Sequence, residues 1–381
     1  MSQGEGVAVV FGTRPEIIKL APVIAALGEA SRPVFTGQHY DAELTSRIFT
    51  SCGMPDLQPA LAGIGGVPRG VQVSAMIGQL TRLFTEQRPA AVIVQGDTNS
   101  TNAGAQAANY LGIPLVHVEA GLRSHDRGMP EEINRLLVSV LADAHCCATA
   151  GNVQALLDGA TAAPETVHLT GNPVVEAVRE LLPGEAERTA VASRLGIPDG
   201  AELVLATIHR PENTDDPDRL RAVLRSLELL AQQGMHVALP LHPRTRNRMA
   251  EAGVRPGPGI NLLLPLDYRD FLALAARARV LVSDSGGLQE EVSVLRVPLV
   301  VVRTSTERPE SVSAGFSLMS SPEGIITSVQ RLLGAESLAR IANAPSPFGD
   351  GHASCRIARI SAALAGISLD ERHDCAPLLA A

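Results

Sequence analysis

Lysine is almost absent from this chain of 381 residues, because 31 of its 32 basic side chains are arginine and Lys19 is the exception. Arginine can replace lysine at most exposed positions. A single remaining lysine therefore marks either a site where a planar guanidinium would not serve or a chance remainder. The composition leaves both readings open.

The chain also lacks a surplus of positive charge. It has 40 acidic and 32 basic side chains, which gives a formal net charge of −8. Polyanions and anionic membranes attract proteins that carry a basic face, so we expect neither nucleic acid nor a membrane as a partner. With 45% hydrophobic and 19% charged residues, the chain can bury a large core and is not disordered.

Cysteine usage and the length of the apolar runs both argue against an exported protein. The five cysteines are odd in number and form no C-x-x-C pair, which argues against a disulfide framework or a zinc site. The apolar run 7–11 is too short for a signal sequence, and no run reaches the roughly 18 residues of a spanning helix. We therefore expect a soluble, reduced, cytoplasmic protein.

Two common nucleotide-binding fingerprints are missing. No G-x-G-x-x-G motif follows a predicted first strand, and there is no G-x-x-x-x-G-K-[ST] loop. Their absence argues against an NAD-dependent oxidoreductase and against a P-loop enzyme. We expect neither a cofactor nor a metal, so that ordinary side chains and the substrate itself supply the chemistry.

Short β-rich runs alternate with helical patterns in two successive series, which predicts βαβ units and parallel sheets. The predicted strands are 7–11, 33–36, 91–94, 115–118 and 167–169 in the first series, and 203–207, 237–240, 260–263, 280–283 and 299–302 in the second. We expect an α/β protein of two doubly wound, Rossmann-like domains, with a boundary near Asn172, a second domain over 173–351 and a tail over 369–381. Ligands of such domains bind beyond the carboxyl ends of the strands, here where the two sheets would face each other across a cleft.

The loop at 285–287 and the helix after it favour an anion-binding site. Ser285, Gly286 and Gly287 precede a predicted helix, whose N-terminal N–H groups attract phosphate. Glu291 could then accept hydrogen bonds from a ribose, and Arg14 and Arg308 could neutralise a diphosphate. A tight turn without any ligand explains the same glycines.

Three carboxylates follow predicted strands of the first series: Asp97, Glu119 and Glu131. They are either helix caps and partners of arginines, as the position of Asp97 before Thr98 suggests, or groups beneath a sugar that move a proton and stabilise positive charge. His209 and His242 follow strands of the second series and share this ambiguity between a site and a buried hydrogen bonder.

Nine short strings, in this order, resemble the UDP-N-acetylglucosamine 2-epimerases of the non-hydrolysing type. The resemblance spans about residues 7–360. The strings are FGTRPEIIK (11–19), GQHYD (37–41), GDTNST (96–101), HVEAGLRS (117–124), MPEEINR (129–135), HRPEN (209–213), DSGGLQEE (284–291), TERPE (306–310) and PFGDG (347–351).

The resemblance implies a GT-B-like architecture, a C-terminal helix at about 352–368 that returns to the 1–172 domain, and a homodimer. It also implies interconversion of UDP-GlcNAc and UDP-ManNAc by inversion at C2. That reaction begins with anti elimination of UDP to a 2-acetamidoglucal, and UDP then adds back with protonation from the other face.

The same resemblance supports two sets of site residues. The catalytic set is Asp97, Glu119, Glu131, His209 and Lys19. The substrate-binding set is Arg14, His242, Ser285, Gly286, Gly287, Glu291 and Arg308, of which His242 rests on its place after a predicted strand alone. Among the carboxylates, we favour Asp97 or Glu131 for the proton steps and Glu119 for electrostatic support.

The chain departs from the family pattern at Asp41, where many bacterial members carry a second polar amide that helps to hold a regulatory UDP-GlcNAc. This departure puts activation by substrate in doubt. Several strings look more like the branch that includes archaeal enzymes and epimerases of modified UDP-sugars such as diacetamido-uronic acids. A hydrolysing epimerase, a GT-B glycosyltransferase and a non-catalytic nucleotide-sugar sensor are the remaining alternatives.

Overall fold

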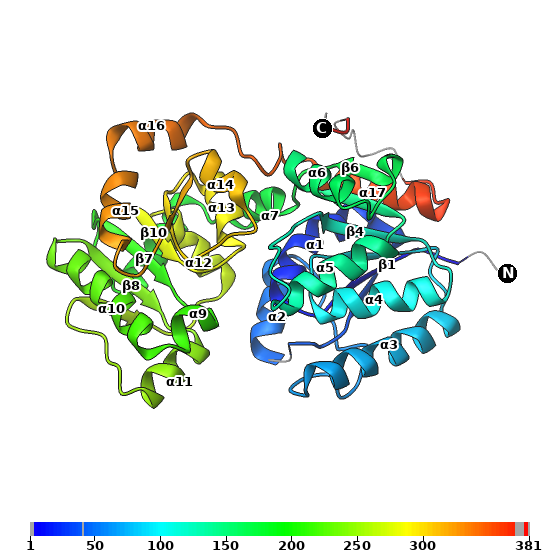
Figure 1. Cartoon of the computed structure of the whole chain (residues 1–381), viewed down its shortest axis with the longest axis horizontal. Helices are drawn as coiled ribbons and strands as arrows, with labels where there is room; N and C mark the ends of the chain where they lie inside the picture. Colours follow the sequence, from blue (N-terminus) through cyan, green and yellow to red (C-terminus); the bar gives the residue numbers. More distant parts are fainter. Residues whose placement is uncertain (1–3, 40–41, 370–376, 380–381) are drawn as a thin grey trace. The chain divides into compact units, whose positions relative to one another are not determined.

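The computed structural model describes residues 4–39, 42–369 and 377–379, apart from the side chains of residues 42–44. The chain divides into two compact units (Figure 1). Unit 1 comprises residues 1–177 together with 348–381, and unit 2 comprises residues 178–347. Helix α7 (Val174–Leu181) carries the chain from the first unit into the second.

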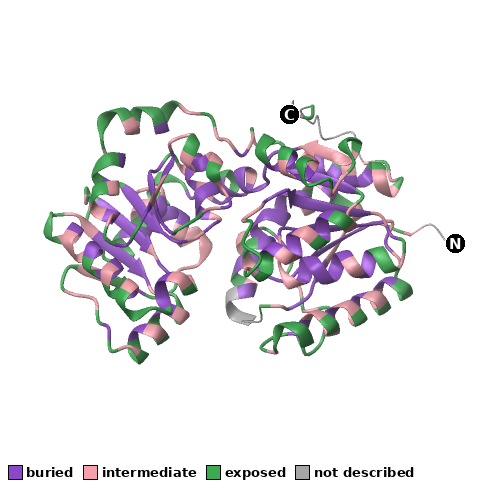
Figure 2. Ribbon diagram, viewed as in Figure 1, coloured by how far each residue is buried: buried purple, intermediate pink, exposed green. Residues whose placement is uncertain are grey.

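Unit 1 contains a parallel sheet of six strands. Their order across the sheet is β2 (Ser31–Phe35), β1 (Val7–Phe11), β3 (Ala91–Gln95), β4 (Leu115–Ala120), β5 (Ala144–Cys147) and β6 (Val167–Leu169). Strands β1, β3 and β4 are buried along their whole length (Figure 2). Helices cover both faces of the sheet, which is why these strands read as continuous apolar runs in the sequence.

Except for the C-terminal helix, the helices of unit 1 connect successive strands. They are α1 (Arg14–Leu27), α2 (Ala42–Ser51), α3 (Arg69–Glu86), α4 (Asn99–Tyr110), α5 (Pro130–Leu141), α6 (Ala150–Asp158) and the C-terminal α17 (Ala353–Ala365), with short 3₁₀ turns at Gly28–Ala30 and Pro164–Thr166. Helix α4 packs between α3 and α5, and α17 packs against α1 (Figure 1).

Alternate strand residues divide the core of unit 1 between two faces. Val10 and Val94 pack with α3 and α4, where Leu80 and Phe84 of α3 are fully or almost fully buried. At Gly104 of α4, an added Cβ would lie 3.0 Å from Val94 and 3.1 Å from Val10. The absence of a side chain at this position lets the helix approach the two central strands.

Unit 2 contains a second parallel sheet of six strands. Their order is β12 (Ser317–Ser320), β11 (Leu299–Val302), β10 (Val280–Ser283), β7 (Leu203–Thr207), β8 (His236–Pro240) and β9 (Ile260–Leu263). Its helices are α8 (Glu185–Arg194), α9 (Pro211–Thr214), α10 (Pro217–Gln232), α11 (Pro243–Glu251), α12 (Tyr268–Ala275), α13 (Leu288–Leu295), α14 (Pro309–Ser313), α15 (Ile325–Leu332) and α16 (Ala335–Asn343).

Each sheet reverses its direction of winding at one place. In unit 1 the strand order grows in opposite directions from β1 and β3, and in unit 2 it does so from β7 and β10. The loops that follow the two strands at such a point diverge and leave room for a ligand. Four loops therefore become the first candidates for a site, namely those after β1, β3, β7 and β10.

Proline starts many of the helices that leave these carboxyl ends. It occupies the first turn of α1, α5, α9, α10, α11 and α14. Its fixed φ suits the first helical residue, where the missing N–H would have no partner within the helix. The recurring Arg-Pro-Glu sequences at 14–16, 210–212 and 308–310 each stand at such a start.

The predicted fold class is confirmed, since both units are doubly wound α/β structures. The ten predicted strands all exist. All five in the second series end at the predicted residue, which is 207, 240, 263, 283 and 302 in turn. Strands β5 and β12 are not among the ten predicted strands. Both are only four residues long and carry a histidine or two serines, so they give a weak apolar signal.

Three cysteines of unit 1 are free thiols, namely Cys52, Cys146 and Cys147. Burial raises the pKa of the Cys147 thiol to about 12. Within the described ranges, no helix is both long and apolar enough to cross a membrane.

Candidate functional site

Lys19 and Glu119 form a buried ion pair in unit 1. The Lys19 Nζ lies 2.9 Å from Oε1 and 3.0 Å from Oε2 of Glu119, and the two side chains are 9% and 3% exposed. Gln95, the last residue of β3, also donates a hydrogen bond to Glu119 Oε2. The pair thus joins α1, β3 and β4, and both carboxylate oxygens are engaged.

A bulge in β4 directs Glu119 toward this lysine. Glu119 has a φ of +61°, and the register between β4 and β5 shifts between Val118 and Ala120. A left-handed conformation is strained for a residue with a side chain, and such strain concentrates at functional sites. A bulge re-aims the side chain at the end of a strand.

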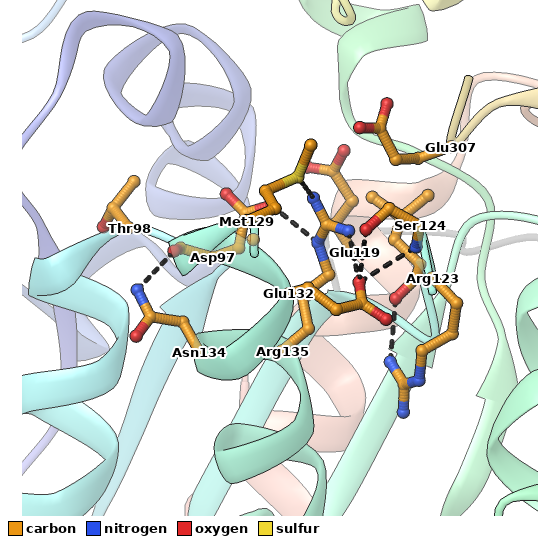
Figure 3. Close-up of polar contacts among 12 residues, drawn as sticks. Asp97, Thr98, Glu119, Arg123, Ser124, Met129, Glu132, Asn134, Arg135 and Glu307 are labelled. Atoms are coloured by element: carbon orange, nitrogen blue, oxygen red, sulfur yellow. Dashed lines mark hydrogen bonds and ion pairs between the residues drawn. The ribbon is translucent and has the colours of Figure 1, made fainter. Parts of the chain in front are cut away.

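Asp97 follows β3 and pairs with Arg135 of α5 (Figure 3). The Arg135 Nε donates to Asp97 Oδ2 at 2.8 Å, and its other end pairs with Glu132 at 2.7 Å. Asn134 donates to the backbone oxygen of Asp97 at 2.8 Å. The Asp97 side chain is 27% exposed, whereas Arg135 and Glu132 are almost completely buried.

The two neighbouring acids of the Pro-Glu-Glu sequence have opposite environments. Glu132 accepts hydrogen bonds from the backbone N–H groups of Ser124 and His125. Burial raises the pKa of Glu132, but these bonds and Arg135 outweigh it, so the net shift is downward. Glu131 lies in the first turn of α5 with its side chain exposed.

Asp97 does not cap helix α4. The N-cap is Thr98, whose side-chain oxygen accepts from the Thr101 N–H at 3.1 Å. The alternative that explained Asp97 as a helix cap is therefore wrong. Its carboxylate instead pairs with Arg135, whose other end pairs with Glu132.

Glu16 of α1 is a further buried acid at this end of unit 1. It accepts hydrogen bonds from the N–H groups of Gly12 and Thr13 and from the hydroxyls of Thr98 and Thr101. Burial raises the pKa of Glu16, and the hydrogen bonds oppose that shift without cancelling it. Its neighbour Arg14 begins α1 and is half-buried.

The stretch that bears on activation by substrate is described only in part. Gln38 accepts hydrogen bonds from the backbone N–H and the hydroxyl of Ser100, both at 2.8 Å. Burial and the charge of Arg14 lower the pKa of His39. Asp41 lies outside the described residues.

In unit 2, Asp284 joins the loops after β7 and β10. Its carboxylate accepts from the N–H groups of His209 and Arg210 at 2.9–3.1 Å and from Asn213 at 3.1 Å. The His209 Nδ1 lies 3.1 Å from Oδ1 of Asp284, whose side chain is fully buried. Burial raises the pKa of Asp284, but the bonds from His209, Asn213 and Arg210 outweigh it and the pKa is lowered.

The predicted glycine turn carries positive charge. Gly287 is the N-cap of α13, and Ser285 N–H donates to Ser283 Oγ at 3.0 Å. A Cβ added to Gly286 would lie 2.8 Å from Nη1 of Arg308 and 3.5 Å from Nη2 of Arg210. A helix start, two guanidinium groups and a glycine that leaves room beside them suit an anion.

Acids hold these cations in place. Arg308 Nε donates to Glu290 Oε1 at 2.5 Å, and Glu307 forms two hydrogen bonds of 2.9 Å with Arg303. Burial raises the pKa of Glu307, but Arg303 and Arg308 overcome it and lower the value to about 2. Glu291, the acid that we predicted, lies half-buried in the first turn of α13.

His242 lies beside His209. Their ring centroids are 5.4 Å apart, and the His242 Nδ1 accepts from the Arg244 N–H at 3.2 Å as the N-cap of α11. His242 is an exposed residue after the carboxyl end of β8. One of its ring nitrogens therefore has a structural role at the start of α11.

The structure thus places the predicted residues at or after the carboxyl ends of strands, namely β1, β3 and β4 in unit 1 and β7, β8, β10 and β11 in unit 2. It brings Lys19 to Glu119 and Arg308 to Gly286, and it leaves Glu131 exposed. Sequence reasoning missed the polar residues that hold the predicted ones in place, although most of them stand inside the quoted strings. The missed residues are Glu16, Gln95, Glu132, Arg135, Arg210, Asp284 and Glu290.

Across the described part of the chain, no group of three or more His, Cys, Asp or Glu is arranged to hold a metal ion. The polar arrangement of unit 1 combines fixed carboxylates, a lysine and an arginine. The arrangement of unit 2 is that of an anion site. Such a chain can bind an anionic group through unit 2 and transfer protons through unit 1.

Comparison with known proteins points to a single family. The family model described as UDP-N-acetylglucosamine 2-epimerase matches residues 29–362. A UDP-N-acetylglucosamine 2-epimerase of Methanococcus maripaludis is 34% identical, over 93% of this chain and 97% of its own length. A UDP-2,3-diacetamido-2,3-dideoxy-D-glucuronate 2-epimerase of Pseudomonas aeruginosa is 33% identical, over 94% and 99%.

A solved structure gives the same indication. The UDP-GlcNAc 2-epimerase of Methanocaldococcus jannaschii, in complex with UDP-GlcNAc and UDP, superposes with a TM-score of 0.82 at 32% sequence identity. The match covers 93% of this chain and 99% of that one.

The buried His117 of β4 makes a prediction about pH. Its Nε2 lies 2.8 Å from the oxygen of Gly96, and burial lowers its pKa to about 4 although that hydrogen bond opposes the shift. Between pH 6.5 and 4 the unfolded chain binds a proton at this residue that the folded chain does not, so the free energy of unfolding falls as the pH falls. The expected contribution is about 2–3 kcal/mol, at about 1.4 kcal/mol per pKa unit.

Urea unfolding at pH 7 and pH 4.5 measures this contribution. His117→Gln keeps a donor toward Gly96 but does not titrate, so the variant should lose less stability than the wild type over this interval. Burial also lowers the pKa of His145 and His168, and the difference between the two proteins removes their share. Parallel profiles would contradict the assignment to His117.

Proposed function

The chain belongs to the UDP-N-acetylglucosamine 2-epimerase family, and from this membership we propose that it interconverts UDP-GlcNAc and UDP-ManNAc without net hydrolysis. It is an isomerase of nucleotide sugars. The observation that carries the proposal beyond the family is the pair of cation-bound carboxylates at the carboxyl ends of β3 and β4, where Glu119 pairs with Lys19 and Asp97 pairs with Arg135.

The chemistry explains why such a site is needed. The proton on C2 of the sugar is not adjacent to a carbonyl group, so its direct removal is very unfavourable. Departure of UDP builds positive charge at C1, which makes the C2 proton removable and leaves a 2-acetamidoglucal. UDP then adds back while a proton arrives on the opposite face. Nearby carboxylates stabilise the positive charge of the transition state and exchange the proton.

The environments of the three acids support different roles. Both oxygens of Glu119 are engaged by Lys19 and Gln95, so this carboxylate suits electrostatic support more than proton transfer. Asp97 pairs with Arg135 and keeps 27% of its side chain exposed. Glu131 is exposed in the first turn of α5. We assign the proton steps at C2 to Asp97 and Glu131.

We assign UDP to unit 2. Ser285, Gly286 and Gly287 present the start of α13 to the diphosphate, and Arg308 neutralises part of its charge. His209, oriented by Asp284, contacts the departing UDP, with His242 next to it. Arg14, at the start of α1, and Glu291, for the ribose, complete the proposed set. No cofactor or metal takes part in this scheme.

Among the alternatives, the C2 epimerisation of a modified UDP-sugar has specific support. The relative from Pseudomonas aeruginosa bears the name of an enzyme that acts on a diacetamido-uronate. The reaction at C2 is the same in both cases, so the choice concerns only the groups at C3 and C6. Neither a glycosyltransferase nor a nucleotide-sugar sensor would benefit from acids placed to act at C2.

We also propose a homodimer in the cytoplasm. Support for the dimer comes from the family resemblance and from exposed apolar side chains on unit 1, notably Tyr110 at 67% and Val140 at 68% exposure. Sedimentation equilibrium measures the mass of the assembly, and a monomer at micromolar concentration would refute the dimer. Cell fractionation tests the location.

Incubation with UDP-GlcNAc in D2O tests the proposed reaction. Proton NMR should show deuterium entering C2 while the UDP-sugar remains intact and a second epimer accumulates. Free ManNAc with UDP would indicate a hydrolysing enzyme. Absence of exchange would refute UDP-GlcNAc as a substrate, and a parallel incubation with a UDP-diacetamido-uronate would then decide for or against the modified sugar.

Replacement of the acids tests their proposed roles. Asp97→Asn and Glu131→Gln should each lower the rate of C2 exchange by about 10²-fold or more, because each removes a group that transfers a proton. Glu86→Gln, on the exposed surface of α3, is the matched control and should exchange at the wild-type rate. A near-normal rate in either variant would remove that residue from the proton path.

Lys19→Arg tests whether the single lysine has a function. The side chain is buried and donates to both oxygens of one carboxylate, so a longer planar guanidinium cannot occupy the same place. We expect the rate of C2 exchange to fall by roughly 10-fold or more although the charge is kept. The reverse exchange at an exposed position, Arg82→Lys in α3, should have no effect. Normal exchange by Lys19→Arg would mean that the lysine is a chance remainder.

A further inference from the structure

The Glu16 carboxylate lies between the two loops that meet at the strand reversal of unit 1. Its Oε2 accepts from the N–H of Gly12 at 3.0 Å and of Thr13 at 2.8 Å, both in the loop after β1. Its Oε1 accepts from the hydroxyls of Thr98 at 2.8 Å and Thr101 at 3.1 Å, both after β3. Each oxygen therefore serves one loop.

Capping of α1 explains only part of this arrangement. In a capping box the glutamate at the third helical position accepts from the N–H of the N-cap residue, here Thr13. An exposed glutamate or glutamine could do this equally well. Glu16 is buried at 2% exposure and also binds two hydroxyls more than 80 residues away in the chain. These long-range bonds need another explanation.

The two threonines fix the start of helix α4. Thr98 is its N-cap, and the Thr101 hydroxyl also lies 2.6 Å from the backbone oxygen of Gln95. Asp97 stands between these contacts, one residue before Thr98. Arg135 and Asn134 hold Asp97 from the side of α5, and the contact of Thr98 with Glu16 ties the following residue to α1. The position of the Asp97 carboxylate therefore depends on both sets of contacts.

We propose that Glu16 is a positioning residue for the reaction, which holds the loop of Asp97 at a set distance from α1, the helix that carries Lys19. This inference rests on the proposed function, because it concerns the proton step assigned to Asp97. Glu16 does not touch the substrate in this scheme. It acts through Thr98 and the backbone of the β3 loop.

Unit 2 contains a counterpart of Glu16, so the capping of α1 alone does not explain a buried carboxylate at this place. The fully buried Asp284 follows β10 and accepts from the N–H groups of His209 and Arg210 after β7. Each strand reversal is thus closed by one buried carboxylate that joins the two diverging loops. In unit 2 the residues so held are those assigned to UDP, so replacement of Asp284 should affect nucleotide binding instead of proton transfer.

Glu16→Gln tests the contacts with one loop separately from the contacts with the other. The amide oxygen can still accept from Gly12 and Thr13, which spares the start of α1 and Arg14. The amide NH₂ then faces the threonine hydroxyls and reverses the direction of those hydrogen bonds. We expect C2 exchange at saturating substrate to fall roughly 10-fold, because small displacements of a catalytic group are costly. The Kd for UDP, measured by calorimetry, should change less than about threefold.

Thr98→Val and Thr98→Ser provide a matched pair. The valine keeps the shape of threonine and loses the hydroxyl that contacts Glu16, whereas the serine keeps that hydroxyl. Thr98→Val should lower the exchange rate about as much as Glu16→Gln, and Thr98→Ser should retain most of it. The double variant Glu16→Gln/Thr98→Val should be no slower than either single variant, since both interrupt one contact.

Asp284→Asn is the comparison in unit 2 and should weaken UDP binding by roughly 10-fold. Full exchange by Glu16→Gln, an equal loss of UDP affinity in that variant, or additive effects in the double variant would each overturn the inference. These outcomes have meaning only where the wild type exchanges deuterium at C2. A wild type without exchange would refute the proposed function, whereas an active wild type with an equally active Glu16→Gln would refute only the role of Glu16.

Discussion

Burial of carboxylates is the constraint on which the rest of this structure depends. A carboxylate without partners in the interior loses several kcal/mol of hydration, so each buried acid must bring its own donors. Glu119 obtains them from Lys19 and Gln95, which connects β4 to α1 and β3. The left-handed bulge at Glu119 exists within that set of contacts, and removal of the lysine would leave both the charge and the strain uncompensated.

The same rule organises unit 2 with arginine in place of lysine. Glu290 pairs with Arg308, Glu307 with Arg303, and Asp284 with His209 and the backbone around it. Each of these acids orients a group that the family resemblance connects with UDP, or a neighbour of such a group. The chain therefore combines an acidic total charge with a local concentration of cations. That combination suits one small diphosphate and does not suit a polyanion.

Fixed and exposed acids have different uses in unit 1. Glu119 and Glu132 are buried, saturated with hydrogen bonds and suited to hold charge or backbone in place. Asp97 is fixed by Arg135 and is 27% exposed, and Glu131 is exposed. A reaction that removes a proton from one face of a carbon and returns it to the other needs exposed acids such as Asp97 and Glu131. Buried acids such as Glu119 and Glu132 then keep the surrounding groups in position.

The sequence by itself determined the fold class and most strand positions, and it indicated the strand-end loops that carry the candidate site. The strands of a buried parallel sheet appear in the sequence as short apolar runs. In this chain, Arg-Pro-Glu and Gly-Gly sequences mark where helices begin. The sequence did not determine which acids would be buried. Glu131 and Glu132 are identical neighbours, and only Glu132 accepts a hydrogen bond from the loop at 124–125. Asp97 and Thr98 are both suitable helix caps, and only Thr98 accepts the hydrogen bond from Thr101 in α4. The hydrogen bonds of three partner residues join parts of the chain that are far apart in sequence; these residues are Arg135, Asp284 and Glu16. Only the tertiary structure decides such contacts, because a hydrogen bond depends on distance in space and not on order in the sequence.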